Sequence, residues 1–428
     1  MWVLSLVLWA GWGEQMETVQ TLMETARKDT LAYERLGELC LGIGHRLSGS
    51  KGLEEAVVWG QATMEKDGAD RVWLQEVMVP HWERGEEHLW LTEPTHEELP
   101  FLSFGGSVGG VAEGEVLVVS SYDELGPRAE GKIILFNIPK ETPGLEGYGD
   151  VVGYRYGGAT AAAEWGATGA LLRSIADGSL RTPHTGGMSY GEGAEKIPYG
   201  AITVEDAERL QWLQDRGTPA RVKMSLGAKT YPDALSHNVI GEIRGTTYPD
   251  EVVIVSGHLD AWDVGQGAHD DGAGVIHALE TLRLIRELGI QPKRTIRAVL
   301  WTNEENGSRG GKSYADAFGE GTFAAIESDL GGFQPIGWVS TGTGEQKAWL
   351  DRLLEGWGLP HIGNGGGVDI GHLEPHGTLL IGLRPDDTHY FDYHHAPSDT
   401  WDAVDERELR EGLAHVAALT WLLANTEE

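Results

Sequence analysis

Residues 252–305 hold two apolar runs separated by a helical pattern, an order that constrains the fold more than any other feature. The first run, Val252–Val255, is followed by Gly257 and predicts a buried strand. Apolar residues spaced by three and four predict a helix from Val275 to Leu288, and Ile296–Trp301 predicts a second buried strand. Strand, helix and strand in this order are typical of two parallel strands in an α/β protein.

Polar side chains follow both predicted strands. His258 and Asp260 come directly after the first strand, and Asp270 lies in the Gly-rich turn that leads to the helix. The acidic pair Glu304–Glu305 follows the second strand. Sites in open α/β sheets form outside the carboxyl ends of the strands, so we expect these side chains to lie at one sheet edge. The arrangement suits a metal site.

Strands and helices alternate along the rest of the chain, which predicts the α/β class. Further strands are expected at 71–79, 87–91, 116–119, 132–136, 170–172, 198–203, 238–241, 324–329 and 378–383. Further helices are expected at 15–41, 53–64, 204–214, 350–357 and 406–423, the second with Ser50 as N-cap. The composition shifts at Gly105–Gly106, and we therefore divide the chain into 14–105, an inserted α/β module at 106–227, and 228–428 with the site.

The composition restricts the partners of this chain. There are 33 Lys and Arg residues against 66 Asp and Glu residues, a formal net charge of −33, which disfavours nucleic acid and anionic membranes. The single cysteine, Cys40, excludes an intrachain disulfide.

Residues 1–13 form an apolar segment that is too short to span a bilayer and resembles the hydrophobic part of a signal peptide. We therefore expect an exported protein, secreted or periplasmic, without membrane insertion. Because no Lys or Arg precedes Arg27, a fraying first helix or a misplaced start codon are the alternatives.

The polar residues at the predicted strand ends converge on one kind of chemistry. Acidic pairs are common in a chain with 66 acidic residues, so Glu304–Glu305 carries little weight alone. Together with His258, Asp270, Asp329 and His395, however, it forms a nitrogen and oxygen donor set that suits two divalent ions, zinc most naturally. No cysteine takes part, which excludes a structural Cys-type zinc site.

These motifs, G-H-L-D-A-W-D-V-G-Q-G-A-H-D-D-G-A-G, W-T-N-E-E, E-S-D-L-G and Y-H-H-A-P-S-D-T, resemble the M28 metallopeptidases. The strings R-L-S-G-S-K, P-H-W-E-R-G-E-E and G-A-K-T-Y-P-D extend the resemblance over nearly the whole chain, toward a carboxypeptidase branch of that family. The resemblance implies a mixed central sheet flanked by helices, with a protease-associated domain as the insert. It also implies a homodimer that cleaves short peptides, most simply unblocked dipeptides.

The resemblance also implies roles for single residues. His258, Asp270 and Asp329 would hold one zinc, and Asp270, Glu305 and His395 the other, with the Asp270 carboxylate shared. Glu304 would be the general base that takes a proton from a water bound by the ions. Adjacent side chains diverge, so Glu304 is not expected to aim at the ion of Glu305. The Asp270–Asp271 peptide would be cis, with Asp271 shaping the turn.

Several further residues are expected around the ligands. Asp260 lies two residues after His258 and is expected to hold its imidazole. Asp399 would support His395 in the same way, or cap the last helix.

For the residues that would contact the substrate, the sequence leaves alternatives open. Asp369 and His372 are expected either to line the substrate pocket or to be ordinary loop residues. Many M28 aminopeptidases have Tyr before the last metal histidine. Here that position is His394, preceded by Tyr393, so His394, Tyr393 and the zinc ions are the alternatives for stabilising the oxyanion.

Two other functions compete with a peptidase. One is a non-catalytic binding protein on the same scaffold, and the other is a single-zinc acyltransferase of the glutaminyl-cyclase kind. All five ligand positions and Glu304 are present, which argues against both, and the number of zinc ions per chain separates the three.

Overall fold

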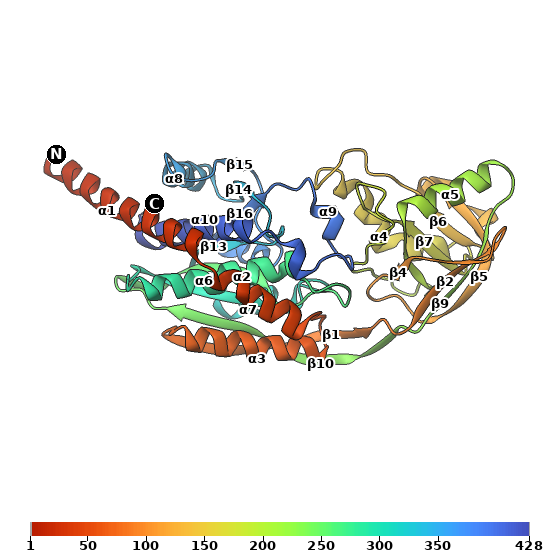
Figure 1. The fold of residues 1–428 in the computed structure, drawn as a ribbon, viewed down its shortest axis with the longest axis horizontal. Helices are drawn as coiled ribbons and strands as arrows, with labels where there is room; N and C mark the ends of the chain where they lie inside the picture. The colour runs from red at the N-terminus through yellow and green to blue at the C-terminus, as the bar shows by residue number, and fades with distance from the viewer. Residues whose placement is uncertain (1, 428) are drawn as a thin grey trace.

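The computed structural model describes residues 2–427, and for residues 2–12 and 14 it describes the backbone alone. Two eight-stranded sheets form two layered bodies that lie next to each other along the long axis of the molecule (Figure 1). In spatial order the first sheet contains β1 (Arg71–Glu83), β10 (Lys229–Ile243), β12 (Arg294–Trp301), β11 (Tyr248–His258), β13 (Thr322–Glu327), β16 (Leu379–Pro385), β14 (Pro335–Ser340) and β15 (His361–Gly363).

The centre of the first sheet is parallel. Strand β11 pairs in parallel with β12 on one side and with β13 on the other, and β13 pairs in parallel with β16. The outer pairs β1–β10, β10–β12 and β14–β16 are antiparallel, so the sheet is mixed and the expected α/β class is confirmed. Because β11, β12, β13 and β16 run in one direction, the residues that follow them all lie at the same edge of the sheet.

Helices cover both faces of the first sheet. The helices of this body are α1 (Trp2–Lys28), α2 (Leu31–Gly37), α3 (Lys51–Lys66), α6 (Ala273–Glu287), α7 (Arg309–Phe318), α8 (Gly344–Leu354) and α10 (Glu406–Asn425). Val253 and Val255 of β11 pack against α6 and α10, whereas Ile254 packs toward α7 on the other face. This alternation explains why β11 is an uninterrupted apolar run, since both of its faces are buried.

The second sheet forms the other body. Its strands are β3 (Glu97–Leu99), β2 (Glu87–Glu93), β9 (Arg221–Leu226), β5 (Gly110–Val119), β6 (Ile133–Phe136), β7 (Gly169–Arg173), β8 (Tyr199–Ile202) and β4 (Phe101–Ser103). Helices α4 (Tyr148–Ala163) and α5 (Val204–Asp215) pack on its opposite faces. Strands β2, β3 and β4 precede residue 106, where we expected the inserted module to begin.

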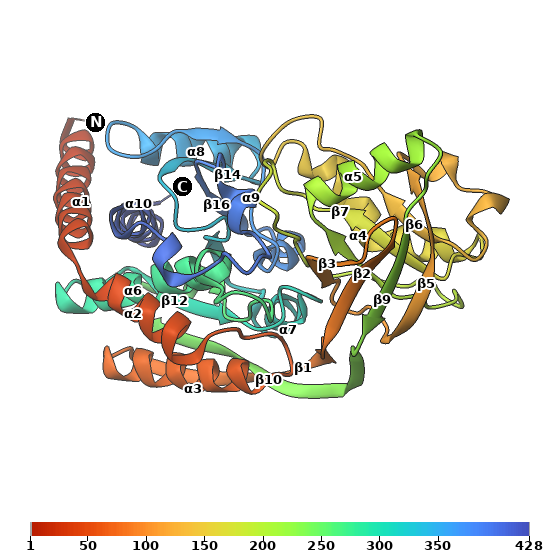
Figure 2. The ribbon, with the colours of Figure 1, turned by 45° about the vertical axis from the view of Figure 1, so that its right-hand side comes forward.

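The two bodies are joined by chain and by packing. The long strands β1 and β10 run from the first body toward the second, and α9 (Tyr390–Tyr393) lies between the bodies in both views (Figures 1 and 2). The Ser50 side chain accepts a hydrogen bond from Leu53 N, as expected for the N-cap of α3.

Of the segment 1–13, expected as a signal peptide, residues 2–13 form the first turns of α1, and the side chains up to residue 12 lie outside the described part of the chain. Farther along α1, Val19, Leu22 and Ala26 are fully buried in the core that α10 also lines. Among the described helices, none combines the length and apolar character needed to cross a membrane.

Candidate metal centre

The carboxylate of Asp270 lies between two imidazoles. Its Oδ1 is 3.1 Å from Nε2 of His258, and its Oδ2 is 3.2 Å from Nε2 of His395. His258 is the last residue of β11, Asp270 lies in the turn before α6, and His395 follows α9, so three separate segments meet at this carboxylate. One carboxylate with an oxygen directed at each of two histidines has the geometry of a bridging ligand.

Each imidazole also faces a carboxylate of its own. Asp329 Oδ1 is 3.2 Å from His258 Nε2, and Glu305 Oε2 is 3.0 Å from His395 Nε2. The five side chains expected as metal ligands therefore meet in two groups that share Asp270. Asp329 follows β13 and Glu305 follows β12, so both reach the site from the carboxyl edge of the parallel strands.

The turn that carries Asp270 is fixed by two other carboxylates. Asp271 accepts hydrogen bonds from the backbone N–H of His258 and of Gly274, both at 2.9 Å, and the Asp270–Asp271 peptide is cis, as the resemblance implied. Asp399 accepts from the N–H of His269 at 2.7 Å and from that of Asp270 at 3.1 Å.

The expected role of Asp399 is therefore wrong in both of its forms. Its carboxylate holds the backbone that presents Asp270 and does not hold the ring of His395. The N-cap of α10 is Asp405, whose side chain accepts from Arg407 N and Glu408 N.

Asp260 also acts on a different group than expected. Nδ1 of His258 is 2.8 Å from the backbone carbonyl oxygen of Asp260, whereas the nearest carboxylate oxygen of Asp260 is 3.8 Å away. The carboxylate instead accepts from the backbone N–H of Glu304 at 3.0 Å and of Glu305 at 3.3 Å. The carbonyl thus orients the imidazole, and the side chain positions the acidic pair.

His395 is oriented by the second body. Its Nδ1 is 3.3 Å from the carbonyl oxygen of Thr185, and the N–H of Thr185 donates to the carbonyl of His395 at 3.0 Å. The neighbouring His184 is buried and places Nε2 2.8 Å from the carbonyl of Phe391, in α9. Sequence reasoning missed Thr185, because a backbone acceptor has no residue signature.

Arg46 is a second residue that sequence reasoning did not single out. It is fully buried and donates to the carbonyls of Gly44, Leu259, Gln266 and Gly267. These bonds tie the segment after β11 to the turn before Asp270. Its place in the string R-L-S-G-S-K was the only sequence signal for it.

The two candidates for the oxyanion position lie in different surroundings. The ring of His394 stacks on that of His395 with centroids 3.6 Å apart, and its buried Nδ1 has no hydrogen-bond partner among the described residues. The ring of Tyr393 stacks instead on His269, at 4.9 Å, and packs against Phe333. Of these two side chains, His394 is the one in direct contact with a proposed metal ligand.

The electrostatics of these side chains favour bound cations. Burial lowers the pKa of His395, but the charges of Glu305 and Asp270 outweigh it and raise that pKa to about 9. Burial raises the pKa of Glu305 to about 7 and that of Glu304 well above its usual range. The site therefore contains more buried negative charge than its surroundings balance. For this reason its carboxylates resist ionisation and His395 retains its proton. Two divalent cations would supply the missing positive charge.

Asp369 lies next to this acidic cluster. It is 1% exposed, and neither carboxylate oxygen has a hydrogen-bond partner in the described part of the chain. Burial raises its pKa, and the charges of Glu327 and Asp329 raise it further. A buried carboxylate without a donor is costly, so Asp369 is suited to a cationic group that arrives with a ligand.

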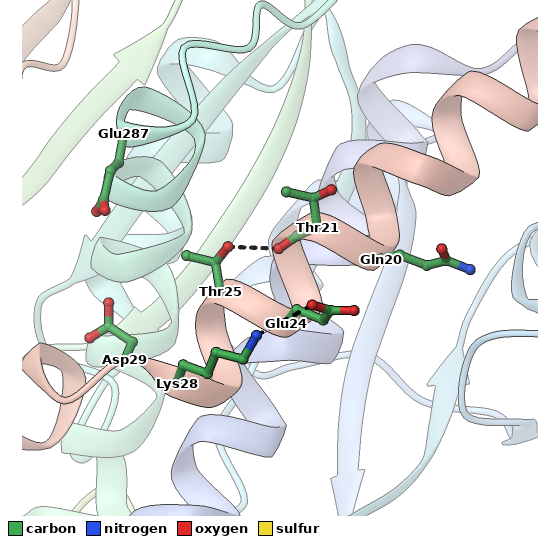
Figure 3. Close-up of a pocket in the computed structure, with 7 residues that line it drawn as sticks. All are labelled: Gln20, Thr21, Glu24, Thr25, Lys28, Asp29 and Glu287. Carbon is green, nitrogen blue, oxygen red and sulfur yellow. Dashed lines mark hydrogen bonds and ion pairs between the residues drawn. The ribbon is translucent and has the colours of Figure 1, made fainter.

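A hollow of about 430 Å³ lies elsewhere, between α1 and the end of α6, and is lined by Gln20, Thr21, Glu24, Thr25, Lys28, Asp29 and Glu287 (Figure 3). Its side chains include no histidine and none of the residues discussed above. We therefore place the chemistry at the sheet edge and not in this hollow.

The fold and the donor set place the chain in the class of metal-dependent hydrolases. A family model described as Peptidase family M28 matches residues 238–420. Carboxypeptidase Q of Bos taurus is 41% identical over 98% of this chain and 90% of its own length, and that of Homo sapiens is 40% identical over the same shares.

Solved structures agree with this assignment. A peptidase M28 precursor from Shewanella amazonensis SB2B has a TM-score of 0.93 at 32% identity, covering 97% of this chain and 98% of the other. A zinc aminopeptidase from Bacillus subtilis, at 19% identity and TM-score 0.69 over 93% of this chain and 95% of its own, shares the fold. The chain belongs to peptidase family M28 and, with it, to the zinc metallopeptidases.

Proposed function

We propose that this chain hydrolyses short peptides, most readily dipeptides with both ends free, at a centre of two zinc ions. The observation that carries the proposal is the Asp270 carboxylate, with one oxygen directed at His258 and the other at His395. The similarity to Carboxypeptidase Q over nearly the whole chain supports the peptide substrate.

The donor set fits two zinc ions. His258, Asp270 and Asp329 would hold one ion, and Asp270, Glu305 and His395 the other. Neutral imidazole nitrogen and carboxylate oxygen are ordinary zinc ligands, and each set leaves room for a further, exchangeable ligand. When bound, zinc lowers the pKa of water and polarises the carbonyl of the substrate.

Glu304 is the proposed general base. Its backbone N–H is held by the Asp260 carboxylate, as is that of Glu305, so one fixed segment carries both side chains. Glu305 forms the ion pair with His395, whereas Glu304 forms no ion pair among the described residues. We propose that Glu304 removes a proton from the attacking water and returns it to the leaving amine.

The remaining groups act on the ends of the substrate. Asp369, whose buried carboxylate has no partner among the described residues, would bind the free ammonium group of a short peptide. His394, whose Nδ1 likewise has none among them, is the proposed donor for the developing oxyanion. Both groups act at close range, which favours dipeptides over longer chains.

The proposal is tested with di- and tripeptides that are unblocked, amino-blocked or carboxyl-blocked, assayed with added zinc and after chelation. Cleavage confined to unblocked dipeptides, lost with the chelator and restored by zinc, is the expected result. Zinc per chain is counted on the same samples: two ions support the proposal, one ion favours the acyltransferase, and none favours the binding protein.

We also propose that the protein is exported, as its apolar N-terminal segment indicates, and that it forms a homodimer, as the carboxypeptidase resemblance implies. Light scattering after size-exclusion chromatography decides the oligomeric state. Fractionation of cells that express the full chain decides its compartment, and mass spectrometry of the exported form shows whether residues 1–13 are removed.

A further inference from the structure

The chain crosses between the two bodies at two places that lie against each other. Residues 84–86 lead from β1 into the second body, and residues 227–228 lead from β9 back to β10. The N–H of Gly227 donates to the carbonyl of Glu86 at 2.8 Å, and a Cβ atom added to Gly85 would lie 2.6 Å from the carbonyl oxygen of Gly227. Both crossings belong to sequence strings, P-H-W-E-R-G-E-E and G-A-K-T-Y-P-D, that supply none of the proposed metal ligands.

Arg84 connects the two bodies at the first crossing. Its side chain is buried, and its Nε and Nη2 form a fork with the carboxylate of Asp263, in the segment that follows β11. Its Nη1 donates to the carbonyl and to the hydroxyl of Ser103, at the end of β4. Its Nη2 also donates to the hydroxyl of Thr185 at 3.2 Å. One guanidinium therefore joins the first body to two segments of the second.

The groups that Arg84 holds in the second body are also bonded to each other. Ser103 and Thr185 are fully buried, and the hydroxyl of Thr185 donates to the carbonyl of Ser103 at 2.8 Å. The N–H of Ser103 lies 3.2 Å from both carboxylate oxygens of Glu87, which is 3.8 Å from the guanidinium. A planar guanidinium presents its donors in a fixed fork, so it holds these acceptors in one geometry, which a Lys ammonium group would not impose.

This network ends at a proposed metal ligand. The carbonyl oxygen of Thr185 is 3.3 Å from Nδ1 of His395, and the N–H of Thr185 donates to the carbonyl of His395 at 3.0 Å. Arg84 thus holds the side chain of the residue whose backbone orients that imidazole. The ring of His258 is oriented by the carbonyl of Asp260 instead, within the first body.

Trp262 provides a second contact between this junction and His395. Its ring centroid is 5.7 Å from that of His395, and it directly precedes Asp263, the partner of Arg84. A Cβ atom added to Gly105 of the second body would lie 2.0 Å from the indole. Because the indole fills the space that Gly105 leaves open, a shift between the bodies at Asp263 would displace the ring that packs beside His395.

We propose that Arg84 is a positioning residue for the proposed ion position that contains His395. By holding Asp263 and Thr185 together, it fixes the two bodies where the Thr185 carbonyl meets the imidazole. No contact joins the guanidinium to a proposed ligand among the described residues, so it acts through Thr185. Loss of a group that supports a metal ligand typically costs about 10–100-fold in metal affinity. This inference rests on the proposed two-zinc function.

The test measures zinc affinities of the full chain by competition with a chelator. Arg84→Lys keeps the charge but cannot form the fork with Asp263 and reach Thr185 at the same time. Thr185→Val removes the hydroxyl but keeps the carbonyl that faces His395. We expect each variant to bind one zinc ion about 10–100-fold more weakly and the other with little change. Because the two residues act in series, the double variant should bind no more weakly than the weaker single variant.

Arg297→Lys is the matched control. The side chains of Arg297 and Arg84 are 12% and 9% exposed, and Arg297 binds Glu242 through Nε and Nη2, so the same substitution removes a similar contact. The control should lower the melting temperature by a similar amount and leave both zinc affinities unchanged. Equal weakening of both ions by Arg84→Lys, or no weakening of either, would overturn the proposal. Additive losses in the double variant would exclude action through Thr185 and overturn it as well.

Hydrogen exchange gives a second readout that needs no metal. The N–H of Thr185 donates to His395, so loss of its support should speed the exchange of this amide in metal-free protein. We expect faster exchange at Thr185 in Arg84→Lys but not in Arg297→Lys, and no change at 252–260 in either. Unchanged exchange at Thr185, or faster exchange throughout the chain, would contradict a positioning role. If the wild type binds fewer than two zinc ions, the proposed function fails, while this comparison still decides whether Arg84 positions Thr185.

Discussion

The two histidines of the proposed centre are held by different parts of the molecule. His258 ends β11, and its ring bonds to a carbonyl two residues away, within the first body. His395 has a φ of 56°, lies outside regular structure, and bonds to Thr185 from the second body. One of the two proposed ion positions is therefore built into the central sheet, whereas the other would be completed where the two bodies meet.

This difference suggests that the two bodies have separate roles in the site. The first body supplies the five proposed ligands and the proposed base, while the second supplies backbone support for His395. Changes in the first body should therefore affect both proposed ions or the chemical step. Changes in the second body should affect one of them.

The largest effect should come from Asp270→Asn, because Asp270 is the residue that the two positions share. A carboxamide has one oxygen acceptor in place of two, so both positions lose a ligand of the right charge. We expect zinc content to fall for both ions and peptide cleavage to fall below detection, as measured by elemental analysis and a dipeptide assay. Loss of one ion alone would show that the carboxylate is not shared.

The next largest effect should come from Glu304→Gln, which tests chemistry apart from metal binding. The substitution retains shape but removes the proton acceptor, and general-base catalysis contributes about 10²–10⁴-fold. We expect kcat to fall by that factor while two zinc ions per chain remain. Near-normal turnover would reject Glu304 as the base, and loss of zinc would reassign it as a ligand.

A smaller effect is expected from Asp260→Ala, confined to the first body. Removal of this carboxylate leaves the N–H groups of Glu304 and Glu305 without their acceptor, so both side chains lose their fixed positions. Loss of such supporting partners typically costs about 10–100-fold in metal affinity or activity. The carbonyl of residue 260 still orients His258 in this variant. Zinc bound through His258 should therefore be retained better than zinc bound through Glu305. A zinc titration followed by activity measures both affinities.

The sequence predicted the strands and the ligand types but not the contacts that orient them. The segments that form β11, β12 and β13 are continuous apolar runs, which identify buried strands, and the polar residues after them lie at one edge because these strands are parallel. Strand alternation placed Asp260 beside His258, yet β11 ends at His258, so the chain turns and the carbonyl takes that position. The Asp260 carboxylate bonds across 44 residues, a pairing that no local pattern encodes.

Two elements were missed. Helix α7 is only ten residues long and carries Gly310 and Gly311, which have low helix propensity, in its first turn. Strand β9 does alternate buried and exposed residues and could have been found. Thr185 gave no signal because its role comes from the contact between the two bodies, which only the assembled fold defines.

The smallest effect should come from His184→Ala, which tests the support that the second body gives to His395. His184 bonds to the carbonyl of Phe391 and to the hydroxyl of Ser174, so its loss loosens the loop that precedes His395 without removing a ligand. We expect about tenfold weaker binding of one zinc ion and little change in the other, resolved as two steps in a zinc titration. His88→Ala, at a partly exposed histidine of the same body, should leave both steps unchanged. Equal weakening of both ions would mean that the two positions are not held separately, and the contrast between His258 and His395 would then have no functional consequence.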